Sequence, residues 1–154
     1  MTVFESICTL LKEKNISFRT VQHQPTATSE ESARARGEDI RIGGKAIVLK
    51  IDAGFKLFVL SGALKIDSKK IKDHFKAKSV RFATPEELLA LTGLIPGSVP
   101  PFGVPILNFE LYLDTSVSEN EKIAFNAGSL TDSIIMQAND YLSIANGTTF
   151  SFSH

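Results

Sequence analysis

A loop rich in glycine and proline is the first segment of this sequence whose residue types could support chemistry. Residues 92–103 hold three glycines and three prolines within twelve positions. Glycine lets the backbone approach a ligand closely and adopt positive φ, whereas proline stiffens the chain by fixing φ. A stiff loop that exposes backbone N–H groups can hold a carbonyl oxygen or a carboxylate. The alternative is a loop that only connects a helix to a strand.

A lysine that follows two glycines is the second candidate. Gly43 and Gly44 precede Lys45, which opens an apolar run that is typical of a strand. The lysine of a phosphate-binding P-loop precedes a helix instead, so this segment is not such a loop. As a lone cation, Lys45 could bind a phosphate or a ribose through charge-assisted hydrogen bonds. The alternative is an ordinary solvent-facing residue of the strand.

Most familiar catalytic arrangements are missing. The three histidines are His23, His74 and the terminal His154, and no Cys/His spacing is typical of a zinc site. There is no G-x-S-x-G elbow for a nucleophilic serine. The single cysteine, Cys8, lies beside the apolar stripe of a helix, where burial is a more frequent role than nucleophilic attack. We therefore expect no metal site.

The elements that must position these residues are a mixture of helices and strands. Apolar spacing and capping boxes predict helices at residues 3–14, 28–37, 67–75, 84–92 and 139–145. Strands are predicted at residues 17–21, 45–51, 55–61, 79–82, 106–114, 122–126 and 133–136. The order lacks a regular βαβ repeat, so we predict an α+β fold with a curled, mixed or antiparallel sheet. We expect one domain over residues 1–154, with a frayed polar tail at about residues 146–154.

Composition limits the possible partners. The net charge is zero, which disfavours a strongly basic nucleic-acid binder. Residues 30–81 nevertheless hold 13 Lys/Arg against 7 Asp/Glu, so this segment could face a phosphate backbone. Alternatively, its lysines are only the solvated face of a helix and its exit: Lys69, Lys70, Lys72, Lys76 and Lys78. No membrane span or signal peptide is recognisable, so we expect a cytoplasmic protein.

The glycine loop and the lysine strand together resemble the YbaK / prolyl-tRNA synthetase-associated editing-domain family. Residues 93–97 match the family's G-x-x-P-G loop, and residues 101–103 match the P-F-G that often follows it. Lys45 falls where the family has its strand-opening lysine. Similar segments at residues 64–72, 80–88 and 126–128, together with Asp114, follow in the family's order, so the resemblance covers roughly residues 20–143.

This resemblance implies a mixed α/β fold in which the curled sheet forms a pseudo-barrel surrounded by helices. It implies an aminoacyl-tRNA deacylase that acts in trans, chiefly on tRNA(Pro) carrying a small non-cognate amino acid, without a metal or cofactor. The implied catalytic positions are Lys45 and Gly97. The implied substrate-binding positions are His23, Gly93, Pro96, Ser98 and Gly128. The implied partners are aminoacyl-tRNA and, as a further candidate, prolyl-tRNA synthetase.

The chemistry of an aminoacyl ester agrees with these positions. Such an ester is already activated, so its hydrolysis needs positioning and stabilisation of an oxyanion rather than a strong nucleophile. Backbone N–H groups near Gly97 could stabilise the oxyanion, and Lys45 could bind the terminal phosphate or ribose. The ribose hydroxyl of the tRNA could help to activate water.

Two departures from the family leave the amino acid open. Alanine-specific members carry a His-Pro pair where this sequence reads Phe125-Asn126-Ala127-Gly128, and cysteine-specific members carry a glycine pair where it reads Pro96-Gly97. The main alternative function is a non-catalytic tRNA- or synthetase-binding module of the same fold. A domain that binds a small molecule or another protein is a second alternative. The presence of both Lys45 and the glycine loop favours an enzyme.

Overall fold

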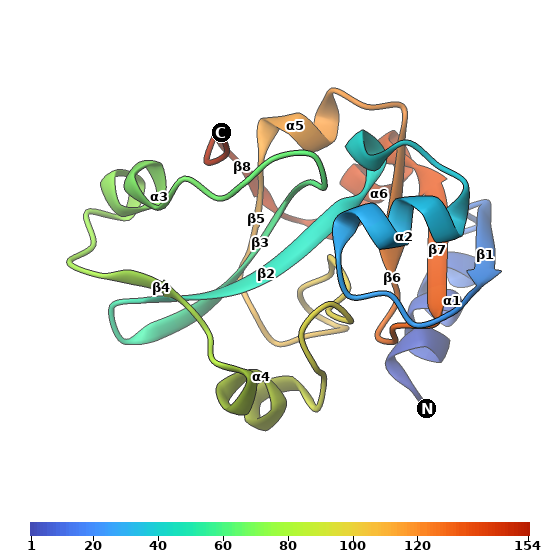
Figure 1. The fold of residues 1–154 in the computed structure, drawn as a ribbon, viewed down its shortest axis with the longest axis horizontal. Helices are drawn as coiled ribbons and strands as arrows, with labels where there is room; N and C mark the ends of the chain where they lie inside the picture. Colours follow the sequence, from blue (N-terminus) through green and yellow to red (C-terminus); the bar gives the residue numbers. More distant parts are fainter.

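The computed structural model describes residues 1–154 and has a mixed α+β fold, as predicted (Figure 1). The α-helices are α1 (Val3–Glu13), α2 (Ser29–Arg36), α3 (Ser68–Phe75), α4 (Pro85–Thr92), α5 (Thr115–Ser118) and α6 (Ala138–Ala145), and a 3-10 turn, η1 (Ile40–Ile42), follows α2. The strands are β1 (Phe18–Gln22), β2 (Gly44–Ile51), β3 (Gly54–Ser61), β4 (Val80–Phe82), β5 (Leu111–Leu113), β6 (Lys122–Asn126), β7 (Asp132–Gln137) and β8 (Thr148–Thr149). None of the helices is long and apolar enough to cross a membrane.

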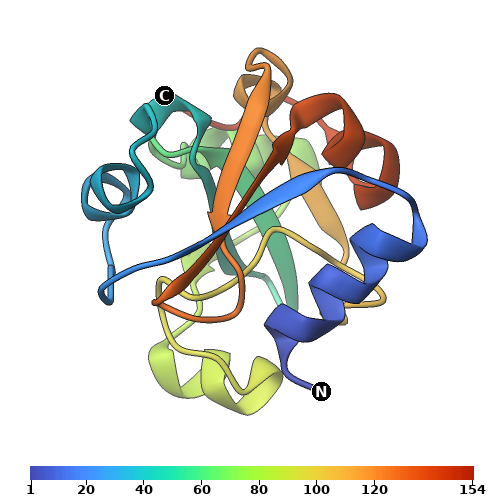
Figure 2. The same cartoon turned by 90° about the vertical axis from the view of Figure 1, so that its right-hand side faces the viewer.

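The strands form two sheets rather than the single curled sheet that we expected. One is antiparallel, with the order β1-β7-β6, and the other is mixed, with the order β4-β2-β3-β5-β8. A parallel bridge between Gly43 and Ala124 joins them beside the start of β2, and no barrel closes. Figure 2 shows the smaller sheet with α1 and α6 on one side and α2 on the other. The start of β2 therefore lies next to β6 and α2.

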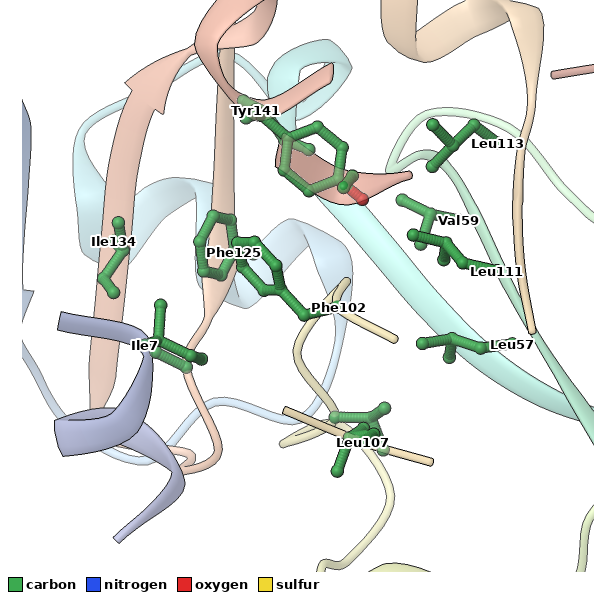
Figure 3. Packing of buried hydrophobic residues seen from close by; sticks show 14 of the residues in the cluster. Ile7, Leu57, Val59, Phe102, Leu107, Leu111, Leu113, Phe125, Ile134 and Tyr141 are labelled. Atoms are coloured by element: carbon green, nitrogen blue, oxygen red, sulfur yellow. The ribbon is translucent and has the colours of Figure 1, made fainter. Parts of the chain in front are cut away.

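The hairpin β2–β3 separates two apolar cores because its side chains alternate between its faces. Val48, Leu57 and Val59 face the larger core, which fills the space between the two sheets. In Figure 3, residues of β3 and β5 line one side of this core, residues of β6 and β7 line the other, and Phe102 lies between them. On the opposite face of the hairpin, Leu49 and Phe58 belong to a smaller core that also includes Phe152.

Threonine capping boxes start three helices. In α2 and α4, as the sequence predicts, the N-cap threonine accepts a bond from the backbone of a glutamate three residues later, and that glutamate bonds back to the threonine N–H. Thr2 and Glu5 do the same at α1. The box at Thr28 fixes where α2 begins beside β2. The box at Thr84 fixes the start of α4, which ends at Gly93, where the glycine loop starts.

The predicted strand at residues 106–114 is mostly wrong. Only β5 forms, because Ile106 and Leu107 both donate to the Gly103 carbonyl and turn the chain instead of extending it. A Cβ on Gly103 would lie 2.7 Å from the Phe109 carbonyl oxygen, so only glycine permits this close approach.

The C-terminal segment 146–154 is not frayed, which corrects our expectation. Its strand β8 pairs with β5, and the Phe152 side chain is completely buried in the smaller core. The buried Asp114 carboxylate anchors this segment by accepting from the Phe152 backbone at 2.7 Å and from the Ser153 hydroxyl at 2.7 Å. The tail is docked by Phe152 and by the partly buried Phe150, which packs against the same core and stacks on His74, although the rest of the segment is mostly polar.

Asp114→Asn should lower the free energy of unfolding by about 1.5–3 kcal/mol, because bonds to an ionised acceptor become bonds to a neutral amide. Burial would raise the pKa of Asp114, but hydrogen bonds from Ser116, Phe152 and Ser153 together lower it. A lowered folded pKa contributes stability above the unfolded value of about 4, and this contribution is lost as pH falls through the folded value. Urea unfolding against pH should therefore show the gap to wild type shrinking in acid.

The exposed Asp73→Asn is the control, since the Asp73 carboxylate accepts no hydrogen bond and pairs with no cation. Equal unfolding midpoints for the two variants at neutral pH would contradict the anchoring role of Asp114.

Candidate active site

A polar cleft lies where α2, the start of β2, the end of β6 and the glycine loop meet. Its volume is about 210 Å³. Thirteen residues line it: Ala27, Thr28, Ser29, Ser32, Arg36, Gly43, Gly44, Lys45, Ala46, Ile47, Gly97, Val99 and Asn126. In Figure 1, α2 runs across the beginning of β2 and the upper part of β6. Segments far apart in the sequence therefore build one site.

The glycine loop enters the cleft as a tight turn over residues 95–98. Ser98 N–H donates to the Ile95 carbonyl at 3.1 Å, with Pro96 second in the turn and Gly97 third at φ +89°. This is the pattern of a type II turn, which needs glycine in third place. The Gly97 N–H donates to no acceptor in the protein. Gly97 lines the cleft, and its N–H is free to bind a ligand.

The loop is fixed on both sides of Gly97. The Ser98 hydroxyl donates back to the Ile95 carbonyl at 2.8 Å, and the Gly128 N–H donates to the Ser98 carbonyl at 2.9 Å. Further along, Phe102 is buried in the larger core, and the Tyr141 hydroxyl donates to the Pro101 carbonyl at 2.5 Å. The turn is therefore held by packing and hydrogen bonds rather than by its prolines alone.

Lys45 reaches into the cleft from the start of β2. Its ammonium donates to the Leu64 carbonyl, which leaves other N–H donors free, since an ammonium has three. Burial lowers the pKa of Lys45, the Glu30 carboxylate opposes this change, and Lys65 adds to it. Pairing of β2 with β3 fixes Lys45 opposite Leu60, so the cation sits on a rigid element.

Arg36 is a second cation of the cleft, and no carboxylate lies within ion-pair distance of it. Its Nε donates to Ser133 Oγ at 2.9 Å and its Nη2 donates to Asn126 Oδ1 at 3.1 Å. Burial lowers the pKa of Arg36 to about 10, which still leaves the guanidinium charged at neutral pH. All partners of this cation are neutral.

The electrostatics of the cleft follow from its lining. Arg36 and Lys45 contribute two positive charges, and no aspartate or glutamate is among the lining residues. The structure has no group of three His, Cys, Asp or Glu side chains that could hold a metal ion. The cleft thus presents donors and positive charge, which suits phosphate, carboxylate or oxyanion groups.

The structure brings only two of the residues suggested by the resemblance, Lys45 and Gly97, to the lining of the cleft. Gly93 caps α4 at φ +73°, and Pro96 is exposed in the turn. Ser98 and Gly128 do not line the cleft, and the bond from the Gly128 N–H to the Ser98 carbonyl helps to hold the loop. A Cβ on Gly128 would meet the Val3 side chain at 2.7 Å, so this glycine packs against α1 rather than facing the cleft.

His23 also lies outside the lining, behind Arg36. Its Nδ1 is 2.8 Å from the Gln24 carbonyl and must donate, because a carbonyl only accepts. Its Nε2 lies 2.8 Å from Ser133 Oγ, and the Ser133 hydroxyl donates to Asn126 Oδ1 at 3.0 Å. His23 therefore orients Ser133, which in turn supports Arg36.

Sequence reasoning missed Arg36 and Asn126 as residues of the site. Arg36 stands in a strongly charged helix that is typical of a solvated surface. A usable signal was the spacing of Ser29, Ser32 and Arg36, which places them on one face of α2. Nothing comparable marks Asn126, because its place in the cleft depends on pairing between distant strands.

Comparison with known sequences adds to this geometry. The sequence model of the aminoacyl-tRNA editing domain matches residues 23–144, which is most of the chain. The chain belongs to the aminoacyl-tRNA editing domain family. The resemblance inferred from the glycine loop and Lys45 is thereby confirmed, and so is the predicted enzyme class, a hydrolase of the aminoacyl-tRNA ester bond.

Relatives of this editing domain include both free-standing proteins and parts of synthetases. The multifunctional Ser/Thr-tRNA deacylase ProXp-y of Escherichia coli is 32% identical over 147 residues, covering 92% of this chain and 87% of that protein. The prolyl-tRNA editing protein ProX of Acetoanaerobium sticklandii is 26% identical and covers 97% and 96%. The proline–tRNA ligase of Shouchella clausii is 35% identical over 65% of this chain but only 17% of that enzyme.

Solved structures agree on the fold. The crystal structure of a protein assigned as a trans-editing enzyme for prolyl tRNA synthetase superimposes with a TM-score of 0.84 over 100% of this chain and 98% of that chain, at 23% identity. At this identity the likeness supports the architecture alone.

Gly97→Ala should destabilise the editing domain more than Gly93→Ala does. Both positions have positive φ, which disfavours alanine by about 1–2 kcal/mol. At Gly93 an added Cβ meets nothing within 4 Å, whereas at Gly97 it lies 3.2 Å from the Ala27 carbonyl oxygen. The free energy of unfolding in urea measures both. Equal losses would show that the turn does not press against Ala27.

Proposed function

We propose that this protein is a deacylase that acts in trans on mischarged tRNA and removes a small non-cognate amino acid from tRNA(Pro). The observation that carries the proposal is the cleft itself. It combines the free N–H of Gly97 with two fixed cations, and it contains no nucleophile paired with a base. Such a site suits a substrate that is already activated.

The reaction needs only water and the ester. Water adds to the ester carbonyl, whose oxygen becomes an oxyanion within reach of the Gly97 N–H. The intermediate then breaks the bond between the carbonyl carbon and the ribose oxygen, which takes up a proton as it leaves. One well-placed oxyanion donor contributes about 10²–10³-fold in rate. A neighbouring ribose hydroxyl of the tRNA can orient the attacking water.

Lys45 serves the charged parts of the substrate, and Arg36 adds to the positive charge of the cleft. Lys45 lies on the strand that forms one wall, so its free N–H donors can bind the terminal phosphate or ribose. No carboxylate lines the cleft, and the nearby Glu30 offsets only part of the positive charge of the two cations. The presence of both Lys45 and the glycine turn also argues against a non-catalytic binding module.

The small cleft volume supports a small amino acid. Relatives that carry the names of prolyl-tRNA editing protein and proline–tRNA ligase support tRNA(Pro) as the carrier. A second candidate substrate is a seryl or threonyl ester. The hydroxyls of Ser29 and Ser32, the amide of Asn126 and the relative named Ser/Thr-tRNA deacylase favour this candidate. Prolyl-tRNA synthetase is the candidate partner that would deliver tRNA.

The proposal is tested by release of free amino acid from a panel of tRNAs charged with alanine, cysteine, serine or threonine, on tRNA(Pro) and on their own tRNAs. Lys45→Ala should reduce the rate on the best substrate about ten- to a hundredfold or more, since it removes a charge-assisted contact of about 1.5–3 kcal/mol. Lys50→Ala is the matched control, because Lys50 lies on the same strand but not in the cleft.

Release from none of these tRNAs would contradict a deacylase. Turnover by folded Lys45→Ala equal to that of Lys50→Ala would contradict the assignment of Lys45 while leaving the activity in place.

Binding of tRNA should be modest and sensitive to salt, with the basic segment 30–81 carrying most of the contacts. Lys69, Lys70 and Lys72 project from α3, which a loop connects to the end of β3 beside Lys45 (Figure 1). Reversing these three charges should lower the slope of log K against log salt by about 2, at roughly 0.7 per contact.

Reversal of Lys12, Lys14 and Lys122 changes the charge equally but lies outside the basic segment, so it should alter the slope less. Equal slopes for the two triple variants would mean that α3 is only a solvated surface. Tight binding without salt dependence would place recognition in base contacts.

A further inference from the structure

The carbonyl of Gly97 is held from the opposite wall of the cleft. Asn126, the last residue of β6, donates from Nδ2 to the Gly97 carbonyl oxygen at 2.9 Å. This bond fixes the peptide unit that follows Gly97, and the turn bond from Ser98 to Ile95 fixes the rest of the turn. Together they determine where the free N–H of Gly97 points.

The orientation of the Asn126 amide is itself determined. Arg36 only donates, so the atom of Asn126 that faces its Nη2 at 3.1 Å must be the oxygen. The Gly97 carbonyl only accepts, so the atom that faces it must be the NH₂ group. A flipped amide would place donor against donor and acceptor against acceptor. Arg36 therefore selects the orientation in which Asn126 can hold Gly97.

Arg36 is in turn held rigidly at the base of the cleft. Its Nε donates to Ser133 Oγ at 2.9 Å, and Ser133 lies 2.8 Å from His23 Nε2. A guanidinium with its planar fork can bridge Ser133 and Asn126 at once, whereas an ammonium cannot match both directions. This chain of bonds connects a buried cation to the turn through one side chain.

We propose that Arg36 and Asn126 are positioning residues, which hold the Gly97 N–H in the place where the ester oxyanion forms. The chain runs from the Arg36 guanidinium to Asn126 Oδ1, and from Asn126 Nδ2 to the Gly97 carbonyl. This inference rests on the proposed deacylase function and adds two residues that neither carry out bond cleavage nor act as bases.

The decisive variant is Asn126→Asp. A carboxylate still accepts from Arg36, but it cannot donate to the Gly97 carbonyl and repels it instead. An oxyanion donor acts in the transition state, so misplacing it should lower kcat with little change in KM. We expect kcat to fall by about ten- to a hundredfold, less than the roughly 10²–10³-fold of a fully lost oxyanion donor because the N–H is displaced rather than removed, and KM to stay within about twofold. Arg36→Lys should give the same pattern.

Asn120→Asp is the matched control. Asn120 also donates from Nδ2 to a backbone carbonyl, that of Arg41 at 2.9 Å, but it does not line the cleft. If Asn126 only stabilised the fold, both asparagine variants would unfold more easily, and Asn126→Asp would not lower kcat more than Asn120→Asp does. In the double variant of Asn126→Asp and Arg36→Lys, the losses should not add, because both act on one turn.

Amide hydrogen exchange over residues 95–99 measures the hold on the turn without any substrate. Exchange at Ser98 should be about three- to tenfold faster in Asn126→Asp than in wild type or Asn120→Asp, as expected for one lost hydrogen bond. Unchanged exchange, unchanged kcat, or a rise in KM alone would each overturn the positioning role. If wild type releases no amino acid from any charged tRNA, the proposed function fails, and the exchange experiment still decides whether Asn126 holds the turn.

Discussion

A backbone N–H can serve a substrate reliably when the loop that carries it is held in one conformation. In this protein the turn at residues 95–98 is held in this way, and apart from the Gly97 N–H only the exposed Pro96 carbonyl lacks a protein partner. Its carbonyls accept from Ser98 and Asn126, its serine hydroxyl bonds within the turn, and Phe102 docks the following chain in the larger core. The N–H of Gly97 is left without a protein partner. The cleft, its charge and its chemistry all depend on this one arrangement.

The second constraint is that Arg36 is a buried cation without a carboxylate partner. A buried guanidinium is costly unless its donors are paired, and Arg36 achieves this with Ser133, Ala124 and Asn126 rather than with a carboxylate. These neutral partners satisfy the hydrogen-bond donors of Arg36 but do not cancel its positive charge. Lys45 adds a second cation on the facing strand. An anionic or oxyanion-forming substrate is therefore attracted to a site whose lining contains no carboxylate.

Much of the fold could be predicted from the sequence because it depends on local signals. The capping boxes at Thr28 and Thr84 fix two helices, and alternation along residues 45–51 fixes a strand between two cores. The division into two sheets, the docking of Phe152 and the short β5 could not be predicted, since they depend on contacts between distant segments. The candidate site divides in the same way. Lys45 and Gly97 stand in recognisable motifs, whereas Arg36 and Asn126 meet only when α2 packs beside β6.

In the proposed complex the Gly97 N–H receives the ester oxygen while Lys45 faces the terminal nucleotide. A crystal structure of the protein with a non-hydrolysable aminoacyl-adenosine amide that carries a 5′-phosphate would show whether both contacts form. We expect the amide oxygen to lie about 3 Å from the Gly97 nitrogen, with the ribose or phosphate beside the Lys45 ammonium. An analogue bound outside the cleft, or bound within it with its carbonyl turned away from Gly97, would show that Gly97 is not the oxyanion donor.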